Sequence, residues 1–237
     1  IKKAYPQQDI IYFADRKSFP YGAKTIEQLK TIIENSIEFL LKRGANFIIL
    51  ASNAPSITVL DKIKNKDKVI GIYPPLKDVM NDKKKNTLII GAKVMIESPE
   101  LQDYIKGEVG DYYKQFHVEN ASPLIQLIEN GDFINNTTET EKTVQKFIND
   151  CEKKFGKLDS ITLSSTHLSW LSSYFKKVIP KAKLYDPADN LVKAIKPYTN
   201  ISKGKIYSII SESEKYPVKD FLKILNTLNI KLDYEII

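Results

Sequence analysis

Short apolar runs alternate with amphipathic stretches along most of the 237 residues. Apolar runs such as 47–51 and 160–163 fit buried strands, whereas 25–43 has apolar residues at helical spacing and stops at Gly44. The pattern predicts strands at 10–14, 47–51, 69–72, 87–90, 112–118, 160–163, 183–185, 205–210 and 232–236. It predicts helices at 25–43, 56–63, 76–80, 99–106, 123–130, 139–155, 168–178, 188–195 and 218–228.

The alternation of strands and helices indicates the class of fold. Parallel strands need crossover connections, and these are usually helices that cover both faces of the sheet. The two halves of the chain follow a similar rhythm on either side of the lysine-rich loop 82–86. We therefore expect an α/β protein with two similar lobes, each a mostly parallel sheet flanked by helices, and a cleft between them.

Charge and composition exclude several classes of function. The net charge of +7 comes from dispersed lysines that alternate with Asp and Asn in loop-like segments such as 62–66, which favours a solvated surface over a nucleic-acid patch. No apolar stretch approaches the roughly 20 residues that span a bilayer. The single cysteine, Cys151, excludes an internal disulfide, and two histidines without clustered cysteines argue against zinc. We expect a cytoplasmic protein that binds no nucleic acid, membrane or metal, and a homodimer stays an open alternative.

Two apolar runs end in small polar residues where a strand should turn into a helix. One run leads to Ser52, and the other leads to Ser165 and His167. Ligands of α/β proteins gather at the carboxyl ends of strands, which makes these residues candidates for a site. Plainer interpretations exist, because serine is a favoured helix N-cap and histidine is often a structural residue.

These segments resemble motifs of the aspartate/glutamate racemase superfamily, most closely those of glutamate racemase. Residues 51–54 resemble the family's A-C-N-T motif, and 164–167 resemble G-C-T-H. Residues 11–15 and 20–25 together resemble the family's Y-F-x-D…P-Y-G-x-K-S/T segment. Residues 121–124 with Glu129 resemble A-C-P-L…E, and Tyr185-Asp186 resembles an I-D pair at a strand end. The resemblance extends in order from residue 1 to about 200.

The resemblance implies a two-lobed protein that racemises an acidic amino acid without cofactor or metal. In the family, two cysteines face each other across the substrate; one thiolate removes the α-proton and the other thiol donates a proton from the opposite face. Transferred position by position, it implies catalytic Ser52, Ser165 and His167, substrate-binding Pro20, Tyr21, Gly22, Asn53, Ala54 and Thr166, and supporting Asp15 and Glu129. The expected ligand is a small amino acid or dicarboxylate. The family's closing segment returns to the first lobe, which predicts lobes of 1–86 plus 196–237 and of 87–195.

The chain departs from the family at the reacting positions. Ser52 and Ser165 stand where the catalytic cysteines are expected, Ala54 replaces the threonine of A-C-N-T, and Met95 falls where a substrate-binding threonine is usual. The family's first strand, with its D-S-G loop, has no counterpart, because Ile1 aligns inside the helix that follows it.

Serine is a poor substitute for cysteine in this chemistry. A free thiol has a pKa of about 8.5, and acid–base catalysis is most efficient near the operating pH. A serine hydroxyl is far less acidic, so two serines should not racemise an amino acid at a useful rate. Three alternatives stay open: an isomerase-type enzyme with a degenerate site, a non-catalytic relative that binds a small carboxylate or a protein partner, and an active racemase with both cysteines replaced.

A serine triad of Ser165, His167 and Asp186 is a further reading of the second motif. We disfavour it, because neighbours two apart in sequence rarely give nucleophile–base geometry and no G-x-S-x-G elbow is present.

Overall fold

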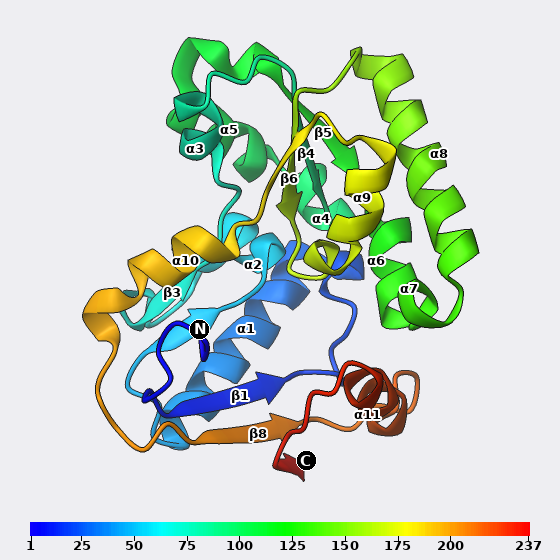
Figure 1. Cartoon of the computed structure of the whole chain (residues 1–237). Coiled ribbons are helices and arrows are strands. Elements are labelled where there is room, and N and C mark those ends of the chain that lie inside the picture. The colour runs from blue at the N-terminus through cyan, green and yellow to red at the C-terminus, as the bar shows by residue number, and fades with distance from the viewer.

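Nine strands form three parallel sheets in the computed structural model, which describes all residues from Ile1 to Ile237 (Figure 1). The largest sheet has the order β5-β4-β6-β7, formed by β5 (Phe116–Asn120), β4 (Thr87–Gly91), β6 (Ser160–Ser164) and β7 (Lys183–Tyr185). A second sheet has the order β1-β8-β9, formed by β1 (Ile10–Ala14), β8 (Ile206–Ile210) and β9 (Tyr234–Ile236). The third pairs β2 (Ile48–Leu50) with β3 (Val69–Gly71).

Eleven α-helices connect and cover the strands. They are α1 (Ile26–Lys42), α2 (Asn53–Thr58), α3 (Leu76–Asn81), α4 (Lys93–Ile96), α5 (Pro99–Val109), α6 (Ser122–Glu129), α7 (Asp132–Asn135), α8 (Thr137–Phe155), α9 (Ser172–Val178), α10 (Ala188–Ala194) and α11 (Val218–Thr227). Short 3-10 turns lie between several of them, including Tyr21–Ala23 after β1 and Leu168–Leu171 after β6. None of the helices combines the length and the apolar character needed to cross a membrane.

Strand β4 shows why this sequence forms a sheet buried on both faces. Successive side chains of a strand point to opposite faces. Leu88 and Ile90 pack with α6, α8 and α9, whereas Ile89 packs with α3, α4 and α5. All five residues of β4 are buried, as expected of a central parallel strand.

The longest helix beside the smaller sheets is α1, and its start and its buried face follow from its sequence. Thr25 and Gln28 form a capping box in which each side chain accepts a hydrogen bond from the other residue's backbone N–H. Leu29, Ile33 and Ile37, at four-residue spacing, form one buried stripe that packs in a core with Ile48 of β2.

The predicted α/β class with two lobes is confirmed. Every strand pair is parallel, and helices cover the large sheet on both faces. We propose the lobe boundaries 1–86 with 196–237 and 87–195. The sheets support this division, because the four-stranded sheet lies within 87–185 and β8 returns from the end of the chain to pair with β1 (Figure 1).

Several predicted element boundaries were wrong. Residues 112–115 belong to a 3-10 turn (Gly110–Gln115), so β5 begins only at Phe116. Helix α2 begins at Asn53, three residues earlier than predicted, because Pro55 is tolerated within a first helical turn, where its missing N–H has no helical partner. The predicted helix 168–178 is a 3-10 turn followed by α9, and the four-residue helices α4 and α7 were not predicted.

Strands β1 and β2 each have only one strand neighbour. β1 pairs with β8 alone, and β2 pairs with β3 alone. Consecutive residues of both strands, 10–13 and 48–50, line the same cleft. Because neighbouring residues of a strand point to opposite faces, a cleft that touches all of them runs along the strand edges.

Candidate functional site

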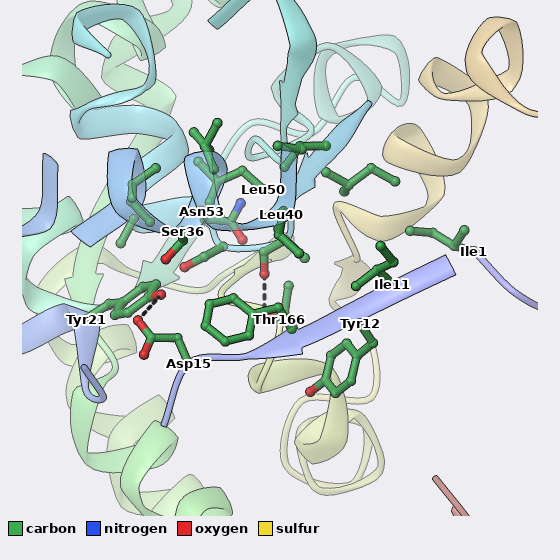
Figure 2. Close-up of a pocket in the computed structure, with 18 of the residues that line it drawn as sticks. Ile1, Ile11, Tyr12, Asp15, Tyr21, Ser36, Leu40, Leu50, Asn53 and Thr166 are labelled. Carbon is green, nitrogen blue, oxygen red and sulfur yellow. Dashed lines mark hydrogen bonds between the residues drawn. The ribbon is translucent and has the colours of Figure 1, made fainter. Parts of the chain in front are cut away.

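The carboxyl ends of β2 and β6 open onto one cleft of about 1590 Å³ (Figure 2). Ser52 and Asn53 line it from the turn after β2, and Ser165, Thr166 and His167 line it from the turn after β6. The hydroxyl of Thr166 donates to the carbonyl oxygen of Ala51 at 3.4 Å, so the two turns touch (Figure 2). Both motifs therefore lie at strand ends beside one cleft, where the sequence pattern placed them.

Ser52 occupies the N-cap position of α2 without capping it. Its backbone is extended (φ −146°, ψ 121°), and its side chain makes no capping hydrogen bond. Its carbonyl oxygen instead accepts hydrogen bonds from the backbone N–H and the hydroxyl of Ser56, at 3.2 and 2.7 Å. The half-buried Ser52 hydroxyl is therefore available to the cleft, which weakens the plain N-cap interpretation.

Asn53 carries a buried acceptor without a partner. Its side-chain nitrogen donates to the carbonyl oxygen of Ile72 at 3.3 Å, which fixes which end of the amide is nitrogen. The residue is 1% exposed, and its Oδ1 atom has no hydrogen-bond partner. A buried acceptor left unpaired costs roughly 1–3 kcal/mol, and this one belongs to a residue that lines the cleft.

The loop after β1 brings Tyr21 and Gly22 to the cleft and holds them through Asp15. Tyr21 donates its hydroxyl to Asp15 Oδ2 at 2.9 Å (Figure 2), while the Ser18 N–H and the Ser211 hydroxyl donate to Asp15 Oδ1, each at 3.2 Å. Burial and the neighbouring Asp15 raise the pKa of Tyr21, so the phenol stays protonated. Asp15 is occupied by the loop itself, as a supporting residue would be.

Gly22 is where this loop approaches the large sheet. A Cβ atom at Gly22 would lie 3.0 Å from the Cβ of Ala92, the residue that follows β4. A larger residue would push the two segments apart. Pro20 and Ala92 also line the cleft, so this close approach forms part of its wall.

The second turn is backed by a charged pair. His167 Nε2 is hydrogen-bonded to Oε1 of Glu129, at the end of α6, and Nη1 of Arg16 lies 3.6 Å from the other oxygen of Glu129. The side chains of Arg16 and Glu129 are only 9% and 13% exposed, against 32% for His167. Burial alone would raise the pKa of Glu129, but the hydrogen bond from His167 and the charges of His167 and Arg16 outweigh burial and lower it. The carboxyl is therefore ionised near neutral pH.

Three other sequence positions have clear locations. Ala54 is buried and lines the cleft. Met95, in α4, is fully buried in the core that α3, α4 and α5 form with β4, and it does not line the cleft. Asp186 accepts hydrogen bonds from the Ser169 hydroxyl and the backbone N–H of Ala188, whereas His167 bonds to Glu129. The disfavoured triad is thus not assembled.

Sequence reasoning missed Arg16 and the three lysines that line the cleft, Lys24, Lys93 and Lys205. The signal for Arg16 was its rarity, since it is one of two arginines among 36 basic residues. Cys151 is buried in α8, and burial together with the nearby Glu119 raises the pKa of its thiol to about 12. Nowhere do three His, Cys, Asp or Glu side chains gather in a way that could hold a metal ion.

Comparison with known proteins places the chain in a family. No family model matches it. A glutamate racemase from Clostridium botulinum (strain Loch Maree / Type A3) is 33% identical over 185 residues, which are 74% of this chain and 67% of that relative. The chain belongs to the glutamate racemase family. This confirms the resemblance inferred from the motifs.

Solved structures of glutamate racemases share the fold. A glutamate racemase isoform from Bacillus anthracis matches with a TM-score of 0.82 and 20% identity, over all of this chain and 90% of that one. Glutamate racemase from Francisella tularensis, solved in complex with D-glutamate, matches with a TM-score of 0.78 and 19% identity, over 100% and 90% of the two chains. At these identities the likeness extends to the fold of the glutamate racemase family and no further.

Proposed function

We propose that this member of the glutamate racemase family binds glutamate or a related acidic amino acid between Ser52 and Ser165. We further propose that the two hydroxyls, in place of the family's thiols, strongly limit its activity as a cofactor-independent amino-acid racemase. The observation that carries the proposal is the meeting of the two strand-to-helix turns at one cleft, where the Thr166 hydroxyl contacts Ala51. The D-glutamate held by the Francisella tularensis relative supports this class of ligand.

The polar groups of the cleft suit an amino acid. The unpartnered Oδ1 of Asn53 can accept a hydrogen bond from an α-ammonium group. Lys24 and Lys93 line the same cleft and provide positive charge for carboxylates. The first backbone N–H groups of α2 have no intrahelical acceptor and add donors beside Ser52. Tyr21 and Gly22 line the same cleft, and Asp15 holds the Tyr21 hydroxyl.

The proposed chemistry is unequal on the two faces of the ligand. Removal of an α-proton needs a base, and a serine hydroxyl ionises too rarely to serve as one near neutral pH. His167 is two residues from Ser165 and lines the cleft, whereas Ser52 is followed by the uncharged residues Asn53 and Ala54. Proton transfer is therefore better supported on the Ser165 face, and inversion, which needs both faces, is expected to be slow.

Calorimetric titration with L-glutamate, D-glutamate and L-aspartate tests the proposal directly. We expect binding of at least one of these ligands, and weaker binding by Asn53→Ala. Lysine, of opposite side-chain charge, is the control ligand and should not bind. Absence of heat with every acidic amino acid would overturn the proposed ligand class.

A second candidate function is non-catalytic binding of the same ligands, favoured by the hydroxyls at both reacting positions. Exchange of the α-proton into deuterated water, followed by proton NMR, separates the two candidates. Slow but protein-dependent exchange supports a residual racemase, and exchange equal to the protein-free rate supports a binding protein.

A further inference from the structure

Arginine is rare in this chain, and each of its two arginines faces a glutamate. Of the 36 basic residues, only Arg16 and Arg43 are arginines. Arg43 forms two hydrogen bonds, both of 3.0 Å, with Glu235 at the surface, where the side chains are 37% and 34% exposed. Arg16 instead lies buried beside Glu129. A buried guanidinium is costly unless it is well paired, so its location calls for an explanation.

Arg16 is held by its own loop and by a segment about 200 residues away in sequence, 216–221. It follows β1, its Nε donates to the carbonyl oxygen of Tyr216 at 3.1 Å, and its guanidinium stacks over the ring of Phe221 at 4.8 Å. A second ring, that of Phe19, lies 6.0 Å from the guanidinium and 6.4 Å from the imidazole of His167. These contacts leave Nη1 directed at Glu129.

The two oxygens of Glu129 are used by different partners. Oε2 faces Arg16, and Oε1 is bonded to Nε2 of His167. An ionised carboxylate can only accept hydrogen bonds. The proton in the bond to His167 must therefore sit on Nε2, and a neutral imidazole then has its free lone pair on Nδ1.

We propose that Arg16 is a positioning residue for His167: it holds Glu129 as an aimed carboxylate, which fixes the imidazole proton on Nε2 and leaves Nδ1 as the atom that can exchange a proton with the cleft. The use of that atom on a ligand rests on the proposed function, whereas the tautomer itself does not. Without Arg16, and with a neutral imidazole, only the hydrogen bond from His167 would oppose burial, which shifts Glu129 toward its protonated form. A protonated carboxyl can donate to the ring, and the imidazole then loses its single arrangement.

Nitrogen-15 NMR of the ligand-free protein tests this, because the chain has only two histidines, His167 and His117. His117 lies in β5, where its ring stacks on that of Phe155, and it provides an internal control. Long-range proton–nitrogen spectra at a pH where His167 is neutral should show one tautomer, with the proton on Nε2. Arg16→Met keeps an apolar stem against Phe221 and removes the charge. It should abolish the single-tautomer pattern of His167 and leave that of His117 unchanged.

Two further variants keep the test decisive. Arg43→Met is the matched control and should leave both histidines unchanged. Arg16→Lys should retain the Nε2 tautomer at least in part, since the positive charge is kept, and it replaces Arg16→Met if that variant does not fold. An unchanged His167 tautomer in Arg16→Met would overturn the proposal, as would equal changes at both histidines.

The outcome is separable from that of the proposed function. Loss of the tautomer in Arg16→Met together with absent amino-acid binding would retain the role of Arg16 and remove the ligand. An unchanged tautomer with intact amino-acid binding would remove the role of Arg16 and retain the proposed ligand.

Discussion

The two turns that meet in the cleft differ in what lies behind them. Ser52 is followed by Asn53, whose buried amide has an unused acceptor and no charge. Ser165 is followed by His167, which is bonded to Glu129 and, through it, backed by Arg16. Similar strand-to-helix positions therefore carry different chemistry.

The difference separates holding a ligand from moving its proton. The first turn offers neutral hydrogen-bonding groups that bind without changing charge, whereas the second contains an imidazole, the side chain that titrates nearest to neutral pH. A site with two equivalent thiols would treat both faces of an α-carbon alike. With serines at both positions, only the second turn keeps a group suited to acid–base work.

The largest effect is expected when both turns receive thiols. Ser52→Cys with Ser165→Cys should raise α-proton exchange of glutamate by about 10²- to 10⁴-fold, the usual contribution of a positioned acid or base. Each single variant should gain much less, because the two faces act as one unit. Proton NMR in deuterated water measures all four proteins. Strong exchange by the unchanged chain would show that serine or His167 already suffices.

The next effect concerns the support of the second turn. Glu129→Gln leaves the buried Arg16 without a counter-charge and should lower the free energy of unfolding by about 3 kcal/mol, since breaking a buried pair from one side typically costs 3–5 kcal/mol. Glu235→Gln breaks the exposed pair with Arg43 and should cost less than about 1 kcal/mol. Urea unfolding compares the two. Equal losses of unfolding free energy in the two variants would mean that burial of the Arg16–Glu129 pair does not add to its effect on stability.

A smaller effect is expected at the first turn. Asn53→Ala should weaken binding of an acidic amino acid by about 1–3 kcal/mol, because the ligand loses a buried acceptor. Removal of the unpaired Oδ1 should not itself lower the free energy of unfolding of the variant. Asn46→Ala changes an exposed residue elsewhere in the same cleft and serves as the control in calorimetry. Equal affinity of the two variants would remove Asn53 from the site.

The smallest effect is a dependence of stability on pH. The pKa of Glu129 is lower in the folded protein than its ordinary value, so its contribution to stability is present above about pH 4.5 and is lost as the pH falls through the folded value. Glu129→Gln should therefore lose less stability than the parent between neutral and acidic pH. Thermal unfolding followed across that range measures the slope. A steeper loss of stability with falling pH in the variant than in the parent would contradict this prediction.

Sequence alone indicated the fold and the first layer of the site. Buried parallel strands appear as continuous apolar runs, and the residues that follow such runs, Ser52 and Ser165, could be placed at strand ends from that pattern. Arg16 could not be paired with Glu129, because nothing local relates the loop after β1 to the end of α6. The packing of Met95 could not be predicted either: its position in the motif does not reveal that the short helix α4 turns the side chain into the core.

The single pairing of β1 and β2 has a consequence for backbone protection. Central strand β4 is flanked by β5 and β6 and fully buried, so its amide hydrogens can exchange with solvent only when the sheet itself opens. β1 and β2 each border the cleft along an edge that has no strand neighbour. The N–H groups on those edges are therefore not protected by hydrogen bonds to an adjacent strand. Hydrogen exchange is therefore expected to be fast along the wall of the cleft and slowest in the middle of the large sheet.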